Sequence, residues 1–187
     1  MIPGNLQSRY IDMYFTTATV KNWKHLLRKD EYKRIIVDSL EFLVQEGTVS
    51  VFAFVIMPNH FHVVWQLIGE QDLSKVQLRL MKFIAQKIKF DLQENHPGVL
   101  AQFKVDRTDR QYQFFKERPL SIPIYTEKVA KQKIDYIHKN PIQPKWNLCQ
   151  SPEDYFWSSA AFYTKAEMNW TFLWHFWYGQ DWPPPFD

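Results

Sequence analysis

Cysteine is almost absent from this sequence, with Cys149 the single one among 187 residues. One cysteine cannot form an intramolecular disulfide or a zinc site built from several cysteines, and its isolation fits a reducing compartment. The sequence also lacks any run of about 18 apolar residues, the length that a membrane-spanning helix needs. Its first residues do not combine a positively charged segment with an apolar one, as a secretion signal does. We therefore expect a cytoplasmic protein that does not enter a membrane.

A strong excess of either charge is missing as well. The formal net charge is +3 and the isoelectric point is near 8.8, so the total charge alone does not indicate a nucleic-acid-binding protein. Hydrophobic residues make up 45% and charged residues 23%, which is typical of a folded globular chain. Aromatic residues are dense at 17%, and composition cannot divide them between a core and a stacking surface.

The periodicity of apolar residues predicts seven elements along the chain. Their order is strand, helix, strand, strand, helix, strand, helix, over residues 10–20, 30–46, 51–57, 60–66, 72–94, 99–123 and 126–140. The fourth strand has loose boundaries within 99–123, where residues 111–116 are a strand-like piece. This order predicts an α+β fold, a ferredoxin-like βαββαβ sandwich with an antiparallel sheet and both long helices on one face. The helix over residues 126–140 is the C-terminal helix that follows this βαββαβ unit, and a tryptophan-rich extension would come after it. We expect one domain over residues 8–163 and an extension over residues 164–187 that wraps the core, with its last residues, WPPPFD, loosely held.

Two histidines stand out on the second strand of the central hairpin, in the stretch VFAFVIMPNHFHVVWQ. Successive strand residues point to opposite faces, so His60 and His62 share one face while Phe61 and Val63 share the other. Two residues along a strand span roughly 6.6 Å, which lets two imidazoles converge on one metal ion with bonds of about 2.1 Å. The spacing equally fits a strand whose solvent face happens to hold two histidines.

Basic residues recur at positions that could follow a nucleic-acid backbone. Lys75, Arg79 and Lys82 lie in one row on the predicted helix 72–94, and arginines alternate with aromatic residues between 107 and 118. Lysine and arginine neutralise phosphates, and aromatic rings stack on bases. The alternatives are a solvated helix face and an ordinary sheet edge. The candidate DNA-binding residues are Lys75, Arg79, Lys82, Arg107, Arg110 and Lys133.

The helix 126–140 carries Tyr136 and Asn140 four residues apart, and therefore on one face. Tyr136 could instead be a tyrosine packed against the sheet, and Asn140 could simply end the helix before a proline. His138 points away from Tyr136, so we expect it to have a surface role. His175 lies among aromatic residues and is expected to be a packed side chain.

Three motifs in this order resemble a known family: MPNHFHVVW, YIHKNPIQPKW and PEDYFWSSAAFY. The sequence resembles the single-tyrosine HUH transposases, and in particular the REP-associated tyrosine transposases, over about residues 10–163. The resemblance implies that His60 and His62 are metal ligands, that Asn140 completes the metal site, and that Tyr136 is the nucleophile. The implied cofactor is Mg²⁺ or Mn²⁺.

The expected function is therefore cleavage and rejoining of single-stranded DNA at hairpins, through a 5′-phosphotyrosine intermediate. The expected partner is single-stranded or hairpin DNA, and the protein would be a monomer, or a homodimer if active sites are shared. Two other functions stay open. One is a domesticated, non-catalytic hairpin-binding protein; the other is a metal-dependent hydrolase that uses the H-x-H pair and a water nucleophile.

Overall fold

The computed structural model describes residues 10–178 of the chain. Its four strands are β1 (Met13–Thr19), β2 (Val49–Met57), β3 (His60–Leu67) and β4 (Leu120–Pro123). Its helices are α1 (Asp30–Gln45), α2 (Leu73–Asn95), α3 (Pro97–Ala101), α4 (Glu127–Lys139) and α5 (Ala160–Thr164). None of the helices within residues 10–178 has the length and apolar character of a membrane span.

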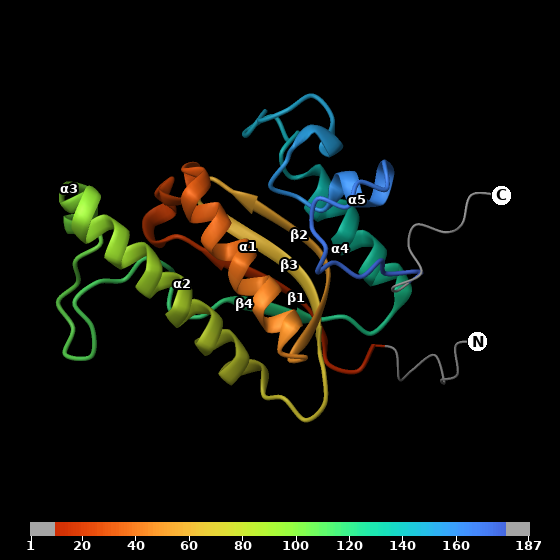
Figure 1. The fold of residues 1–187 in the computed structure, drawn as a ribbon, viewed down its shortest axis with the longest axis horizontal. Coiled ribbons are helices and arrows are strands. Elements are labelled where there is room, and N and C mark those ends of the chain that lie inside the picture. Colours follow the sequence, from red (N-terminus) through yellow and green to blue (C-terminus); the bar gives the residue numbers. More distant parts are fainter. Residues whose placement is uncertain (1–9, 179–187) are drawn as a thin grey trace.

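The strands form one antiparallel sheet in the order β2-β3-β1-β4. A crossover through α1 places β2 beyond β3, and a second crossover through α2 brings β4 to the free side of β1 (Figure 1). This is the strand order of a ferredoxin-like βαββαβ sandwich, so the predicted fold class is confirmed.

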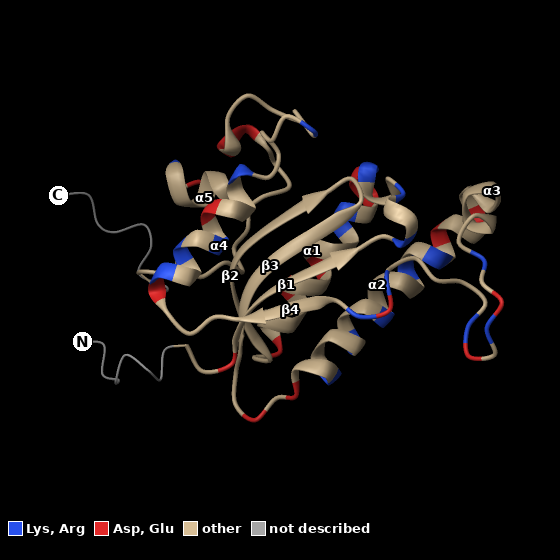
Figure 2. Cartoon of the chain, turned by 180° about the vertical axis from the view of Figure 1, so that it is seen from behind, with Lys and Arg blue, Asp and Glu red and all other residues tan. Residues whose placement is uncertain are grey.

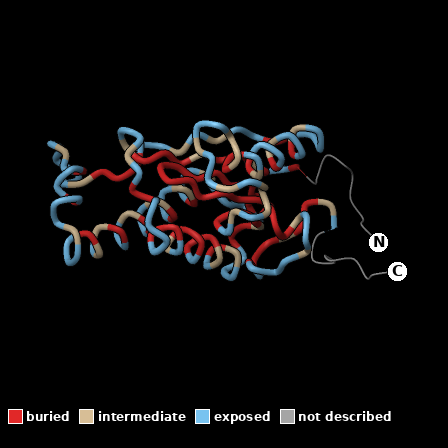
Figure 3. The backbone as a smooth tube through the Cα atoms, turned by 90° about the horizontal axis from the view of Figure 1, so that it is seen from above, coloured by how far each residue is buried: buried red, intermediate tan, exposed pale blue. Residues whose placement is uncertain are grey.

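The two faces of the sheet are covered by different helices, which gives three layers (Figure 1). On one face, Phe61, Val63 and Trp65 pack in a common apolar cluster with α1 and α2. On the other, Val55 and Val64 pack with α4 residues. Buried backbone runs through the middle of the molecule, with exposed segments outside it (Figure 3). Both long helices thus lie on one face, as expected, and α4 lies on the face that holds the two histidines.

The fourth strand lies within the stretch 99–123, as the sequence predicted, but not in its most strand-like piece, residues 111–116. Residues 111–116 make only isolated bridges, including Phe115 with Val20, and the strand that completes the sheet is β4. Phe114 and Phe115 are neighbours and both buried, which a half-buried strand with alternating faces does not allow. β4 is only four residues long and ends in Pro123, which an edge strand tolerates because one side has no partner.

The segment after α5 packs along the β2 edge. Leu173 forms a parallel bridge with Val51, and the Trp174 amide donates to the Val51 carbonyl at 2.9 Å. Trp170, Phe172 and Leu173 join the apolar cluster on the α1 and α2 side. The extension therefore wraps the core as far as it is described, and the closing WPPPFD lies outside the described residues.

Candidate functional site

The two histidines of β3 lie side by side on the sheet face that α4 covers. Their ring centroids are 4.7 Å apart, and their exposed fractions are 6% for His60 and 4% for His62. The strand alternation places them on one face, as the H-x-H spacing predicts. Two buried imidazoles this close need either hydrogen-bond partners or a shared ligand.

The hydrogen bonds around His60 determine which ring nitrogen carries its proton. The Asn59 side-chain amide donates to the Trp23 carbonyl at 3.1 Å, which turns the Asn59 oxygen toward His60. His60 Nδ1 lies 2.7 Å from that oxygen and must therefore donate to it. Nε2 of His60 is then unprotonated, with its lone pair available to a metal ion.

His62 is held from the neighbouring strand. Thr17 on β1 lies directly opposite His62 in the sheet register, and its Oγ1 is 2.8 Å from His62 Nδ1. Nε2 of His62 is buried and has no hydrogen-bond partner among residues 10–178. A buried nitrogen without a partner is costly in a native structure, so this atom points to a ligand that binds there.

Both imidazoles are neutral at ordinary pH. Burial, with a smaller contribution from the Lys145 ammonium, lowers the pKa of His60 to about 4. Burial also lowers the pKa of His62 to about 3, with contributions from His60, Lys145 and Lys133. Neutral imidazole is the form that binds metal ions, so no proton has to be removed first.

Tyr136 lies next to the histidine pair. Its ring centroid is 5.3 Å from that of His62 and 6.0 Å from that of Phe15 on β1. α4 is held to the sheet through Ala130, Ile134 and Ile137, and this packing turns the Tyr136 face toward the histidines. The side chain is 42% exposed, so a large substrate can reach the hydroxyl.

Asn140 stands one turn beyond Tyr136, at the C-cap of α4. It keeps helical backbone angles, φ −59° and ψ −45°, so its side chain continues the face that carries Tyr136. The residue is 1% exposed, and both polar atoms of its amide lack hydrogen-bond partners within the described part of the chain. Ending the helix does not require a buried, unpaired amide, whereas a ligand role would use its oxygen.

The donor set fits a divalent metal ion. His60 Nε2 and the Asn140 oxygen are neutral donors, and His62 Nε2 is a third when His62 Nδ1 donates to the Thr17 hydroxyl; the two imidazole rings are adjacent. The four strands carry no Lys, Arg, Asp or Glu (Figure 2). Within residues 10–178 no three His, Cys, Asp or Glu side chains come together as a metal cluster. The site therefore differs in its donors from a carboxylate-rich hydrolase centre.

The loop after α4 adds two residues that sequence reasoning did not identify. The Trp146 ring lies between His60 and His25, with centroid distances of 5.7 and 6.0 Å. Its indole Nε1 is buried and finds no partner among the described residues. Lys145 is close enough to lower the pKa of both β3 histidines. They are the last two residues of the motif YIHKNPIQPKW, and that position was the only signal that could have pointed to them.

The predicted DNA-binding residues do not gather in one place. Lys133 on α4 lies over the Phe15 ring, with Nζ 4.9 Å from the centroid, and so belongs to the histidine site. Lys75, Arg79 and Lys82 are on α2, in the layer behind the opposite face of the sheet (Figure 2). The predicted arginines already have acidic partners: Arg79 pairs with Glu46, Arg107 with Glu117 and Arg110 with Asp109. Their contact with DNA stays a prediction.

A groove of about 600 Å³ runs between α2 and residues 109–117. Lys82, Gln86 and Lys89 line it from the helix, and Arg110 and Tyr112 line it from the loop. Of the predicted DNA-binding residues, Lys82 and Arg110 both line this groove, although the sequence predicted them as parts of separate features.

His138 does not have the surface role that its spacing suggested. Its side chain is only partly exposed, and Nε2 lies 2.9 Å from the buried Ser159 hydroxyl. The ring also packs against Tyr163, with centroids 5.1 Å apart. Burial lowers the pKa of His138 to about 3. His138 does point away from Tyr136, but the segment containing α5 covers that side of α4.

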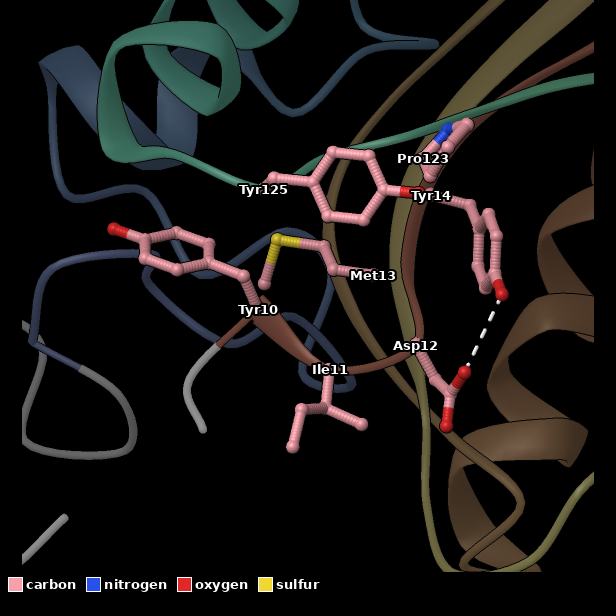
Figure 4. Close-up of a pocket in the computed structure, with 7 residues that line it drawn as sticks. All are labelled: Tyr10, Ile11, Asp12, Met13, Tyr14, Pro123 and Tyr125. Atoms are coloured by element: carbon pink, nitrogen blue, oxygen red, sulfur yellow. Dashed lines mark hydrogen bonds between the residues drawn. The ribbon is translucent and has the colours of Figure 1, made fainter. Parts of the chain in front are cut away.

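A second hollow, of about 460 Å³, lies at the start of β1 (Figure 4). Aromatic side chains dominate it, and Tyr14 donates to Asp12 at 3.3 Å across its rim. Tyr125 extends over it from the segment before α4 (Figure 4). It contains none of the unpaired buried nitrogens found at His62 and Trp146, so the histidine site is the stronger candidate.

Comparison with known proteins gives a match in structure and none in sequence. No protein-family model and no curated protein matches the chain. Among solved structures, a REP-associated tyrosine transposase bound to a REP hairpin matches with a TM-score of 0.59 and 16% identity, over 91% of this chain and 89% of that one. A candidate transposase from Deinococcus radiodurans matches with a TM-score of 0.46 and 14% identity, over 74% and 97%. The first match shows that this chain shares the fold of the family that its three motifs resemble.

Proposed function

We propose that this protein is a transposase-type enzyme that cleaves and rejoins single-stranded DNA through a covalent bond to Tyr136. The observation that carries the proposal is the accessible Tyr136 ring, 5.3 Å from His62, beside two buried neutral imidazoles with free lone pairs. A solvent-accessible phenol next to a metal-binding donor set is what nucleophilic attack on a phosphodiester requires.

In the proposed reaction the Tyr136 oxygen attacks a DNA phosphorus and forms a phosphotyrosine bond to the 5′ side. The bond to the 3′ oxygen breaks, the phenolic proton passes to solvent, and the 3′ oxygen takes up a proton to become a hydroxyl. A free tyrosine has a pKa near 10, so it attacks poorly unless the charge developing on the phosphate is neutralised. His60, His62 and Asn140 would hold Mg²⁺ or Mn²⁺, which supplies that neutralisation as a Lewis acid.

The second half of the reaction reverses the first. A 3′-hydroxyl from another strand attacks the phosphotyrosine, the bond to Tyr136 breaks, and the phenol recovers a proton. The covalent bond retains the energy of the phosphodiester, so joining needs no nucleotide cofactor. Lys133 beside Phe15 and Lys145 beside the histidines supply positive charge to the strand that occupies the site.

The proposed substrate is DNA that folds as a hairpin with a short single-stranded flank. Two observations support it: the three sequence motifs, and a shared fold with a transposase whose structure contains a REP hairpin. The groove between α2 and residues 109–117 would take the hairpin part, since it combines lysines with Arg110 and Tyr112. We place this activity in the cytoplasm.

The test is formation of a covalent protein–DNA adduct. We expect the wild-type protein, given Mn²⁺ and an oligonucleotide with a hairpin and a single-stranded flank, to form an adduct that survives denaturing electrophoresis. Tyr136→Phe should abolish the adduct, because phenylalanine keeps the ring and removes the nucleophile. Tyr125→Phe is the matched control, since that side chain is 73% exposed and lies outside the histidine site.

Two results would replace the proposal with another function. Tight hairpin binding without an adduct on any single-stranded substrate would indicate the non-catalytic DNA-binding protein. Cleavage that survives Tyr136→Phe but is lost in His60→Ala would indicate a hydrolase with a water nucleophile.

A further inference from the structure

Buried polar atoms without partners occur in the histidine pair, at the end of α4 one turn beyond Tyr136, and in the loop that packs on His60. They are His62 Nε2, both amide atoms of Asn140, and the indole Nε1 of Trp146. Each would be costly to bury unpaired, and native structures pair the great majority of such atoms. Their concentration at one place indicates that the site is built to receive polar atoms from a ligand.

These atoms are of two opposite kinds. The Asn140 oxygen offers lone pairs, and His62 Nε2 offers one when Nδ1 donates to the Thr17 hydroxyl; both suit a cation. The Trp146 indole is a donor only and the Asn140 amide nitrogen is a donor, so neither can bind a metal ion. A metal ion alone would leave these donors unpaired, whereas an anion bound with the metal would pair them.

The charge around the site points the same way. The ammonium groups of Lys145 and Lys133 both act on His62, and Lys145 also acts on His60. A divalent cation beside two ammonium groups would be strongly repelled unless an anion lay between them. A phosphate group meets this requirement, because its oxygens can accept from an N–H group and also face a cation.

Trp146 is held firmly enough to act as a fixed donor. Its ring packs against His60 and His25, and its backbone amide donates to the Gln143 carbonyl at 2.8 Å. The same loop is closed by the Leu148 amide, which donates to the Pro141 carbonyl at 2.9 Å. A donor fixed before the substrate arrives stabilises developing charge without reorganising.

We propose that the indole N–H of Trp146 donates a hydrogen bond to a non-bridging oxygen of the DNA phosphate that Tyr136 attacks. This inference rests on the proposed function for the identity of the anion. It makes Trp146 a catalytic residue in addition to the nucleophile and the metal ligands. No bond to Trp146 forms or breaks, and its proton stays on the indole throughout.

The first test observes the indole directly and does not depend on cleavage. In wild-type protein labelled with ¹⁵N-tryptophan, the Trp146 indole signal is identified as the one lost in Trp146→Phe. We expect this signal to move downfield and saturate when inorganic phosphate is added in the presence of Mg²⁺. The Trp177 indole already donates to Glu127 at 2.9 Å, so its signal should stay in place. A Trp146 signal that does not move overturns the proposal.

The second test measures the reaction. Trp146→Phe keeps an aromatic ring against His60 and removes only the donor, so we expect adduct formation at saturating DNA to slow by about 10- to 100-fold. Mg²⁺ affinity, measured by calorimetry, should be unchanged because the indole does not bind the metal. Trp177→Phe, the matched control, should keep the wild-type rate. A rate for Trp146→Phe within about twofold of wild type, or a loss of Mg²⁺ affinity, overturns the proposal.

The two tests separate this inference from the proposed function. If wild-type protein forms no adduct with any DNA, the proposed function fails, while the phosphate titration still decides whether Trp146 is an anion donor. If the adduct forms and the indole signal stays still, the proposed function stands and the role of Trp146 is wrong.

Discussion

The two histidines are oriented by hydrogen bonds from neighbouring residues. Asn59 accepts from His60 Nδ1 and is itself oriented by the Trp23 carbonyl. Thr17 holds His62 Nδ1 from the adjacent strand. In each ring the hydrogen bond is therefore made by Nδ1 and not by Nε2. Such outer contacts set both ring orientation and metal affinity.

We expect Thr17→Val to weaken Mn²⁺ binding by about 10- to 100-fold, because it removes the hydroxyl that orients His62 and leaves a side chain of similar shape. Isothermal titration calorimetry measures the change. The matched control is Thr164→Val, whose hydroxyl donates only to the Ala160 carbonyl in α5. Equal Mn²⁺ affinity in wild type and Thr17→Val would show that His62 is not held through this contact, or is not a ligand.

The sequence could predict site residues whose positions follow from spacing along one strand or helix. It could not predict site residues that reach the histidines through contacts between segments distant in sequence. The H-x-H spacing places His60 and His62 on one face because strand side chains alternate. The proximity of Thr17 depends on the β1–β3 register, 45 positions away in sequence. Trp146 reaches His60 only because its loop turns back after α4. Neither pairing leaves a periodic pattern in the sequence.

At the scale of elements, α4 is shared between two environments. One face carries Asn140 and places Tyr136 beside His62, and the side with His138 meets the segment around α5. Ser159 connects α4 to the sheet, since its hydroxyl forms hydrogen bonds with His138 on α4 and with the backbone of Phe54 on β2. A change at His138 should therefore alter the position of α4 relative to the sheet.

This contact predicts that the protein loses stability in mild acid. The pKa of His138 is about 3 in the folded protein and 6.5 in the unfolded chain. Between these two values the unfolded chain binds a proton at His138 and the folded protein does not. The His138 contribution is intact above pH 6.5 and decreases as the pH falls toward 3. Allowing for partial exposure of the side chain, we expect it to cost about 1–2 kcal/mol at pH 5.

Urea unfolding at pH 7.5 and pH 5 measures this effect as a difference between proteins. Wild type should lose about 1–2 kcal/mol more of its free energy of unfolding than His138→Gln does between the two pH values. Glutamine can still bond Ser159 but does not titrate, and contributions from His60, His62 and His175 cancel in the comparison. The same loss in both proteins would contradict a buried, neutral His138.

The elements themselves were largely predictable, with one instructive exception. α1, α2 and α4 follow from apolar residues at helical spacing, and Thr126 caps α4 by accepting from the Val129 amide, as its position before the helix predicts. The fourth strand could be placed only within the broad stretch 99–123, because Leu120–Pro123 is short, largely exposed and ends in proline. Its pairing with β1 comes from the crossover topology and leaves little trace in local sequence.

At the scale of the whole molecule, the sheet separates the proposed reaction site from the α2 row. Tyr136 and the histidines lie on the α4 side, while Lys82 lies on the helix layer behind the other face. The segment 109–117 connects the sheet with the α2 layer. The Lys116 amide donates to the Thr19 carbonyl at the end of β1, and the same segment lines the groove beside α2. A hairpin in that groove would lead its flanking strand past the sheet edge toward Tyr136.

This arrangement predicts that binding and cleavage depend on different lysines. We expect Lys82→Gln to weaken hairpin binding and to make the dependence of log affinity on log salt concentration less steep by about 0.9, the change for one lost phosphate contact. The cleavage rate at saturating DNA should not change, because Lys82 lies in the layer away from Tyr136. Fluorescence anisotropy across a salt series and a single-turnover adduct assay measure the two quantities.

Lys87→Gln is the matched control on the same helix, outside the row and over the Phe83 ring. If Lys82→Gln and Lys87→Gln have the same salt dependence as wild type, the row is a solvated helix face. The hairpin would then have to bind on the α4 side, close to Lys133 and Lys145.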